Sequence, residues 1–213
     1  MHMIANEFLE LTSDDVLADR PFTHVDNTEL DHADLERIRT LLREALQQPN
    51  APTNTPYEIS GDAHRFVILN REALLAAQPI TVVGFCASKR SNLSPALLEE
   101  MNVVDGDLMH ELTQHPDMLT YSSIKLPDGN WKNLVLLRTE DGVGHWRNSH
   151  RHVYAVNMLS PQYYANVRLH NGVLPQGLAS PKIILASTKY YDFDSESTWR
   201  AIRFQSPTPK GES

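Results

Sequence analysis

Residues 115–156 read HPDMLTYSSIKLPDGNWKNLVLLRTEDGVGHWRNSHRHVYAV, and this stretch decides the fold. Two apolar runs, at 118–126 and 131–138, flank the tetrapeptide 127–130, Pro-Asp-Gly-Asn, whose residues favour a tight turn. Both runs carry apolar residues at odd and at even positions, so each predicted strand has apolar groups on both of its faces. The stretch therefore predicts a β-hairpin within a sheet that is covered on both sides.

A buried strand and a helix are predicted before this hairpin. Residues 80–88, ITVVGFCAS, form a short, β-branched and apolar run, which is typical of a buried strand. Ser94 followed by Pro95 supplies an N-cap and a proline at the first helical position. We expect the helix that begins here to be divided into two pieces at Gly106.

Helical patterns and a last strand follow the hairpin. The histidine-rich segment that begins at His145 predicts a helix, and Ser160-Pro161 predicts the start of a second helix that stops at Gly172. Residues 182–193, KIILASTKYYDF, predict the last strand. The resulting βαββαβ order predicts an α+β, ferredoxin-like fold. Helices cover one face of such a four-stranded sheet, and a second copy often covers the other, so an apolar second face predicts a homodimer.

The N-terminal part predicts a docked helical extension. Apolar residues recur at helical spacing between Asp31 and Gln48, at Leu35, Ile38, Leu41, Leu42, Ala45 and Leu46. An isolated helix of this length is marginal in water, so we expect residues 1–50 to pack against the rest of the protein. A Pro- and Asn-rich linker follows, with a short strand at 64–70. We expect an arm at 1–78, a barrel-like domain at 79–193 and a tail at 194–213.

Composition narrows the class of protein and its partners. The chain has 213 residues, 41% of them hydrophobic, and a formal net charge of −8, which opposes binding to nucleic acid. The single cysteine, Cys86, has no partner for an internal disulfide, so we expect a cytoplasmic protein. No export signal and no membrane-spanning run are expected. No bound metal is expected either, because the histidine-rich segment lacks an H-E-x-x-H motif and a nearby carboxylate or thiolate ligand.

The quoted stretch resembles the dimeric α+β barrel superfamily, in its antibiotic-biosynthesis-monooxygenase-like branch. The resemblance covers roughly residues 79–193 and includes a W-x-x-S-x-x-H-x-x-A helix, represented here by Trp146, Ser149, His152 and Ala155. The superfamily contains cofactor-free oxygenases, polyketide cyclases, lactone isomerases, haem-degrading enzymes, haem-dependent dehydratases and proteins without known activity. A fold shared by so many activities does not by itself specify one.

The resemblance implies a cofactor-independent acid/base enzyme of monooxygenase, cyclase or isomerase type. Its substrate would be a small apolar carbonyl or aromatic compound held between sheet and helix. One alternative is a haem-binding protein that uses His150 or His152. Haem-degrading members place the ligating histidine directly after the alanine, where this chain has Val156, which counts against that mode of binding. Another alternative is a non-catalytic stress or scaffold dimer.

Three residues are the predicted catalytic groups: His150, Asn157 and Arg168. At about 100° per residue, Trp146, His150, Val153 and Asn157 fall within about 40° of one line on a continuous helix. An imidazole titrates near neutrality, so His150 is the predicted proton carrier, with Asn157 or Arg168 stabilising an oxyanion. The alternatives are a core histidine bonded to backbone and a salt-bridged arginine.

Five residues are expected to contact the substrate: Trp146, His152, Tyr121, Asn133 and His170. Tyr121 and Asn133 lie on the two predicted hairpin strands, where an amide among apolar neighbours indicates the wall of a binding site or a buried amide within the sheet. His170 is expected on the same short helix as Arg168. His152 lies near the polar boundary of the histidine-rich helix, where a surface or dimer contact is the alternative.

Overall fold

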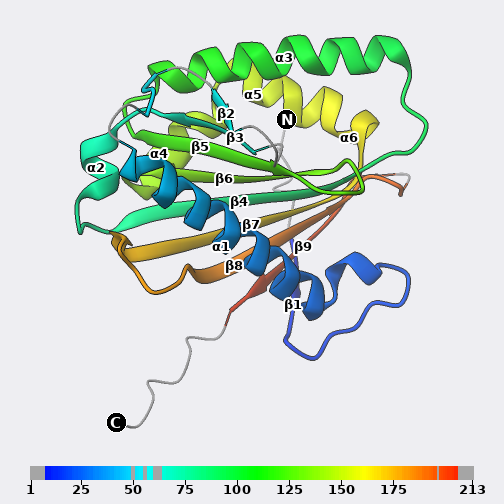
Figure 1. The fold of residues 1–213 in the computed structure, drawn as a ribbon. Helices are drawn as coiled ribbons and strands as arrows, with labels where there is room; N and C mark the ends of the chain where they lie inside the picture. The colour runs from blue at the N-terminus through cyan, green and yellow to red at the C-terminus, as the bar shows by residue number, and fades with distance from the viewer. Residues whose placement is uncertain (1–7, 49–50, 55–56, 60–63, 196, 206–213) are drawn as a thin grey trace, which may run out of the picture.

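The described residues form one sheet with helices on both of its faces (Figure 1). The computed structural model describes residues 8–48, 51–54, 57–59, 64–195 and 197–205. Its strands are β1 (Leu9–Leu11), β2 (Tyr57–Ile59), β3 (His64–Ile68), β4 (Ile80–Lys89), β5 (Met118–Lys125), β6 (Trp131–Leu137), β7 (Tyr164–Leu178), β8 (Ile184–Asp192) and β9 (Trp199–Phe204). Its helices are η1 (Pro21–Thr23), α1 (Val25–Gln47), α2 (Arg71–Leu75), α3 (Pro95–Gln114), α4 (Glu140–Arg147), α5 (His150–Tyr154), η2 (Ala155–Leu159) and α6 (Ser160–Tyr163).

The four central strands form the predicted ferredoxin-like unit. Along the chain they occur as β4, α3, β5, β6, the helices α4 to α6, and β7, which is the βαββαβ order. In the sheet they lie in the order β7-β4-β6-β5, and each neighbouring pair is antiparallel. Gly129 in the β5–β6 turn has a φ of 85°, a conformation that glycine adopts without strain. The order and pairing of these four strands confirm the predicted α+β, ferredoxin-like fold class.

Further strands extend this unit at both edges. β3 and β2 continue the sheet beyond β5, while β8, β9 and β1 continue it beyond β7. β1 pairs in parallel with β9, so residues 9–11 lie beside residues 201–203. The segments that the sequence assigned to an arm, a central domain and a tail thus contribute strands to the same sheet.

The second predicted helix begins at Ser160, as expected, but α6 ends at Tyr163 and the rest of the segment is a strand. Residues 164–178 form β7, which pairs with β4 on one side and with β8 on the other. The predicted last strand is β8, which lies outside the βαββαβ unit. Gly172 does not stop a helix: a Cβ atom there would lie 2.5 Å from the backbone oxygen of Ile184, so glycine permits the close approach of β7 and β8.

Two helical predictions also need correction. α3 runs without a break through Gly106, where the sequence suggested two pieces. The histidine-rich region is interrupted at Asn148 and Ser149, and the Ser149 hydroxyl accepts a hydrogen bond from the backbone N–H of His152 at 3.1 Å. Trp146 and His150 therefore belong to different helices and do not share one helix face.

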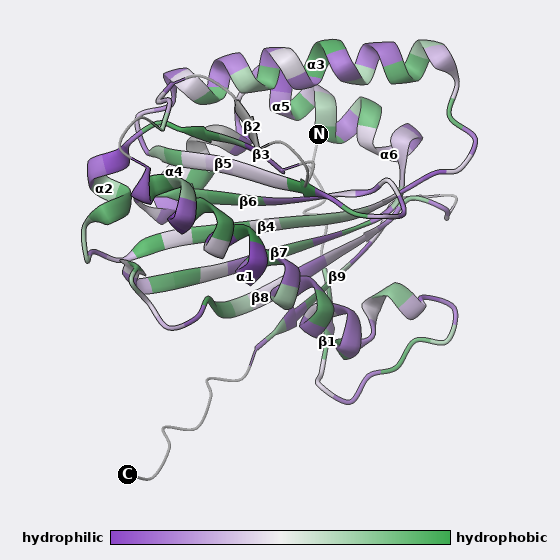
Figure 2. Ribbon diagram, viewed as in Figure 1, coloured by the Kyte–Doolittle hydropathy of each residue, from purple (hydrophilic) through white to green (hydrophobic). Residues whose placement is uncertain are grey.

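α1 covers one face of the sheet and seals the main core. Its residues Leu35, Ile38 and Leu42 are fully buried against strand residues that include Phe66 and Leu134. Figure 2 shows α1 as a mixture of hydrophobic and hydrophilic residues crossing a sheet whose central strands are largely hydrophobic. The docking predicted for this helix is confirmed.

The approach of α1 to the sheet is close at Gly84 in β4. A Cβ atom at this position would lie 2.5 Å from Leu35 Cδ1. The opposite face of the sheet lies under α3, α5 and α6 (Figure 1). Among the residues that the structure describes, no helix is both long enough and apolar enough to cross a membrane.

We expect the protein to be monomeric in solution. The predicted homodimer requires an uncovered apolar sheet face, but the N-terminal helix α1 lies on that face and buries its apolar residues there. Multi-angle light scattering at micromolar concentration should give the mass of one chain, 24.1 kDa. A mass of two chains would contradict this expectation and would require a dimer formed through another surface.

Candidate functional site

The two faces of the sheet differ in their access to solvent. In β4 the side chains of Val82 and Cys86, which face α1, are fully buried, whereas those of Val83 and Phe85 on the other face are partly accessible. β6 shows the same alternation, with Leu134 buried and Asn133 partly accessible. We call the second face, under α3 to α6, the helix-facing surface. Its partly accessible side chains include Arg65, Val83, Phe85, Tyr121, Trp131, Asn133, Val135 and Leu169.

The register of the strands places polar and aromatic groups in one row across this surface. Arg65 in β3 is opposite Ser123 in β5, and Ser123 is opposite Asn133 in β6. Asn133 in turn is opposite Phe85 in β4. Side chains directly opposite each other in a sheet are in contact range. Tyr121 lies one row away on the same face, so the predicted residues Tyr121 and Asn133 do share a surface.

Several polar groups on this surface have no hydrogen-bond partner. Within the part of the chain that the structure describes, neither the Tyr121 hydroxyl nor the Asn133 amide makes a hydrogen bond. The Arg65 guanidinium lies over the Trp131 ring, 4.0 Å from its centroid, and its buried Nε has no acceptor. Burial raises the pKa of Tyr121 far above its ordinary value, so its hydroxyl stays protonated. These groups are available to donate hydrogen bonds to a ligand.

The predicted residues of the histidine-rich helices are not gathered at a buried site. His150 in α5 and Asn157 in η2 have exposed side chains. His152 is partly buried, and burial lowers the pKa of its imidazole, which favours the neutral ring. Trp146 lies in α4, but its side chain falls outside the described part of the structure. The roles of these four residues stay predictions.

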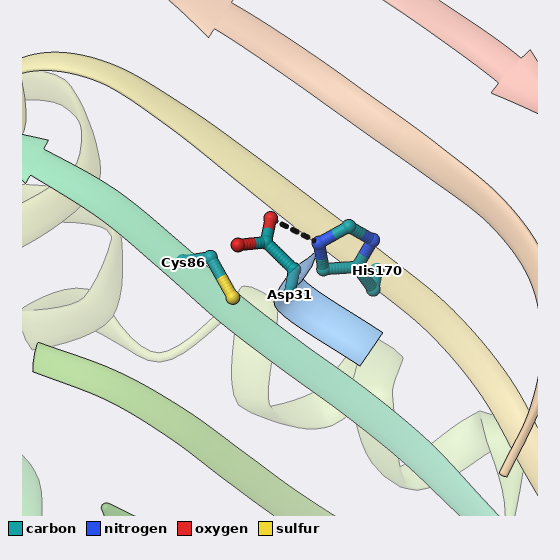
Figure 3. A group of neighbouring side chains, drawn as sticks. All are labelled: Asp31, Cys86 and His170. Atoms are coloured by element: carbon teal, nitrogen blue, oxygen red, sulfur yellow. Dashed lines mark hydrogen bonds and ion pairs between the residues drawn. The ribbon is translucent and has the colours of Figure 1, made fainter. Parts of the chain in front are cut away.

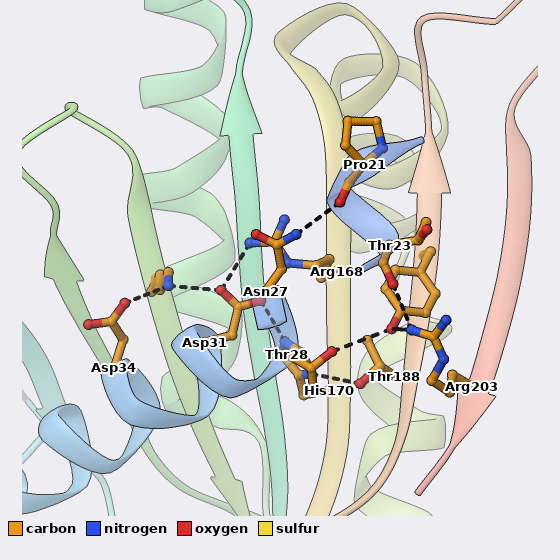
Figure 4. A network of polar contacts seen from close by, with 12 residues as sticks. Pro21, Thr23, Asn27, Thr28, Asp31, Asp34, Arg168, His170, Thr188 and Arg203 are labelled. Carbon is orange, nitrogen blue, oxygen red and sulfur yellow. Dashed lines mark hydrogen bonds and ion pairs between the residues drawn. The ribbon is translucent and has the colours of Figure 1, made fainter. Parts of the chain in front are cut away.

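Arg168 and His170 lie on the opposite side of the sheet, facing α1. Both project from the same face of β7, because they are two residues apart on a strand. Arg168 Nε and Nη2 donate to the two carboxylate oxygens of Asp31 at 2.5 and 2.9 Å (Figure 4). His170 Nε2 lies 2.9 Å from Asp31 Oδ2, and its Nδ1 lies 2.9 Å from Thr188 Oγ1. These contacts are those of a structural ion pair, the alternative considered for Arg168.

Asp31 is the centre of this network, which we call the Asp31 network. Its side chain is fully buried, and Lys132 Nζ lies 2.8 Å from its Oδ1. Lys132 also contacts Asp34 at 2.5 Å. Burial alone would raise the pKa of Asp31, but hydrogen bonds from Arg168 and His170 and the positive charge of Arg168 hold that pKa far below its usual range. The carboxylates and cations of α1, β6 and β7 thus neutralise one another.

Asp31, Cys86 and His170 lie close enough together to suggest a metal site (Figure 3). However, the Asp31 carboxylate already accepts hydrogen bonds from Arg168 and contacts the Lys132 ammonium, and two cations beside it oppose the binding of a third. Burial raises the pKa of the Cys86 thiol well above its ordinary value, so it stays protonated and is a poor metal ligand. The donor set therefore fits an ion-pair network rather than a metal.

Sequence reasoning missed Arg65 and Asp105. Arg65 lies in a strand that the sequence did predict, where its alternation with buried neighbours indicates the opposite face. Asp105 lies in α3, and burial raises the pKa of its carboxyl while the nearby Arg65 lowers it. The sequence shows Asp105 only as one of several acidic residues on a helix.

Comparison with known proteins gives likeness of fold only. No family model matches the chain, and no curated protein matches it. Among solved structures, Rv0793 from Mycobacterium tuberculosis matches with a TM-score of 0.35 and 12% identity, over 46% of this chain and 93% of that one. SnoaB, a cofactor-independent oxygenase from Streptomyces nogalater, matches with a TM-score of 0.32 and 14% identity, over 46% of this chain and 91% of that one. An aldoxime dehydratase matches with a TM-score of 0.28 and 10% identity, over 68% of this chain and 36% of that one. In its βαββαβ strand order this chain resembles the dimeric α+β barrel superfamily.

We expect Asp31→Asn to destabilise the protein by about 3–5 kcal/mol, because it leaves two cations without their shared buried carboxylate. Asp34→Asn is the matched control: the Asp34 side chain is 29% exposed, so its loss should cost about 1 kcal/mol or less. Urea unfolding at neutral pH measures both free energies of unfolding. Equal losses in the two variants would contradict a central role for Asp31.

The same carboxylate should make stability fall in acid. Its pKa in the folded protein is lowered from 3.8, so its contribution is complete above pH 3.8 and is lost as the pH falls towards the folded value. The free energy of unfolding should therefore decrease below pH 3.8 in the wild-type protein. In Asp31→Asn this component of the pH dependence should be absent.

Proposed function

We propose that the protein binds a small apolar carbonyl or aromatic compound at the helix-facing surface and acts on it by acid/base chemistry. The observation that carries the proposal is the set of partly accessible aromatic side chains with unpartnered donors among them, Tyr121 and Asn133. A purely structural sheet face would be expected to bury these groups or to pair them. The α1 face of the same sheet buries its polar groups and also pairs them.

The surface offers apolar contact and directed hydrogen bonds. The rings of Phe85 and Tyr164 meet edge to face, with centroids 5.5 Å apart, and Trp131 adds a further apolar ring. The Asn133 amide and the Tyr121 hydroxyl are donors suited to a carbonyl oxygen. Donors fixed on paired strands are held in place before negative charge develops on that oxygen, which is how oxyanions are stabilised. In this proposal they take the role predicted for Asn157 and Arg168.

The proposed chemistry needs no bound cofactor. Moving a proton to or from an activated carbonyl compound requires a base, an acid and a stabilised oxyanion, all of which side chains supply.

We expect 2-tetralone, a small aromatic ketone, to bind to the wild-type protein and to quench tryptophan fluorescence. Tyr121→Phe removes one hydrogen bond to the carbonyl, so it should weaken binding by about 5- to 10-fold. Tyr154→Phe is the control, because its hydroxyl bonds to Glu100 at 2.5 Å on the exposed side of α5. A failure of 2-tetralone to bind, or an equal loss in both variants, would count against the proposal.

A titration with haemin tests the haem-binding alternative. His150 is exposed, and the His152 ring already has a hydrogen bond to the backbone of Arg147. We therefore expect the haemin spectrum to stay that of free haemin. A red-shifted Soret band that disappears in His150→Ala or His152→Ala would establish haem binding instead.

A further inference from the structure

One side of α3 faces the sheet, and Asp105 lies on it. Leu112 is the fully buried residue of this helix and packs with Met118 and Leu137 of the sheet. Asp105 precedes Leu112 by seven residues, which is two helical turns, so the two side chains lie on the same side of α3. Asp105 is itself accessible to solvent, so a ligand can reach its carboxyl.

Four groups from other elements interact electrostatically with the Asp105 carboxyl. They are Arg65 of β3, Tyr121 of β5, Tyr163 of α6 and Tyr164 of β7. Three of these four groups are neutral phenols whose pKa is raised by burial. Arg65 is the cation of the set, and it does not form an ion pair with Asp105 within the described structure. Among the described residues, the Asp105 carboxylate is therefore near three tyrosines and one arginine and has no contact ion pair.

Arg65 is placed to hold negative charge at the same surface. Its guanidinium lies on the Trp131 ring, and its buried Nε lacks an acceptor. A buried guanidinium N–H without an acceptor is unfavourable unless a ligand supplies one. Through the cross-strand row, Arg65 lies on the same side of the sheet as Asn133. The surface thus combines an accessible carboxylate with an unsatisfied cation and an amide.

We propose that Asp105 is the general base for a ketone held at the helix-facing surface, and that Arg65 stabilises the enolate that forms. The carboxylate takes a proton from the carbon next to the carbonyl. The electron pair of the broken C–H bond forms a C=C bond, and the carbonyl π electrons move to oxygen, where Arg65 and Asn133 bind the negative charge. Asp105 leaves the step as a neutral carboxylic acid and returns a proton to the carbon or to solvent.

This inference rests on the proposed function and makes it more specific. It assigns the substrate to neutral, enolisable ketones with an aromatic or apolar body and an acidic C–H bond beside the carbonyl. Burial raises the pKa of Asp105, which makes its carboxylate a stronger base than an ordinary aspartate. A substrate that already carries a negative charge would be repelled by the same carboxylate.

Exchange of the C1 protons of 2-tetralone in D2O, followed by proton NMR with the full-length protein, tests this step. The wild-type protein should accelerate exchange above the buffer rate, and the rate should fall at acidic pH as Asp105 becomes protonated. Asp105→Asn should lower the saturated rate by at least about 100-fold with an unchanged half-saturating concentration. Asp105→Glu should restore part of the rate, and Arg65→Met should lower it by about 100-fold.

Glu99→Gln is the matched control, because Glu99 is an exposed carboxylate of α3 and lies six residues from Asp105, away from the sheet. Its exchange rate should equal that of the wild type. Binding of 2-tetralone with no accelerated exchange, or with equal rates in Asp105→Asn and the wild type, would overturn the role of Asp105 and leave binding intact. No binding by the wild type would overturn the proposed function itself, and the role of Asp105 with it.

Discussion

The buried carboxylate of Asp31 is the interaction on which the rest of the structure depends. It joins α1 to β6 through Lys132 and to β7 through Arg168 and His170, so one side chain connects the N-terminal helix to strands more than a hundred residues away. An ion network of this kind is a weak source of net stability but is costly to break, because each remaining charge would be buried without a partner. The network therefore determines the position of α1 more than the free energy with which α1 packs on the sheet. The apolar residues of α1 supply most of the buried area.

The position of α1 makes the two faces of the sheet unequal. On one face, helix and strands approach so closely that a side chain at Gly84 would displace the Leu35 side chain, and the polar groups are paired. On the other face, only Leu112 of α3 is fully buried, and aromatic and polar side chains keep access to solvent. A second copy is not needed to cover the sealed face. The accessible aromatic and polar side chains of the sheet are therefore concentrated on the side that the helices leave partly open.

Local sequence patterns predicted much of the fold and less of the candidate site. The strands β4, β5 and β6, their hairpin and the helix α1 follow from apolar spacing and turn residues, which depend on near neighbours. β7 was missed because Ser160-Pro161 and Gly172 resemble the start and stop of a helix. Val167 and Leu169 alternate with Arg168 and His170, which is a strand pattern. The polar residues on one face of this strand are explained only by their contacts with Asp31. Strand periodicity placed Tyr121 and Asn133 on one face correctly, whereas Asp105 comes near Arg65 only through tertiary packing.

The parallel pairing of β1 with β9 imposes an order on assembly during synthesis. Residues 9–11 leave the ribosome well before their partner strand at 201–203 has been made. Likewise, α1 can form its ion pairs with β6 and β7 only after those strands have emerged. Until those strands have been made, the apolar side chains of α1 stay unburied. During that interval, α1 presents an apolar surface that chaperones for nascent chains are able to bind.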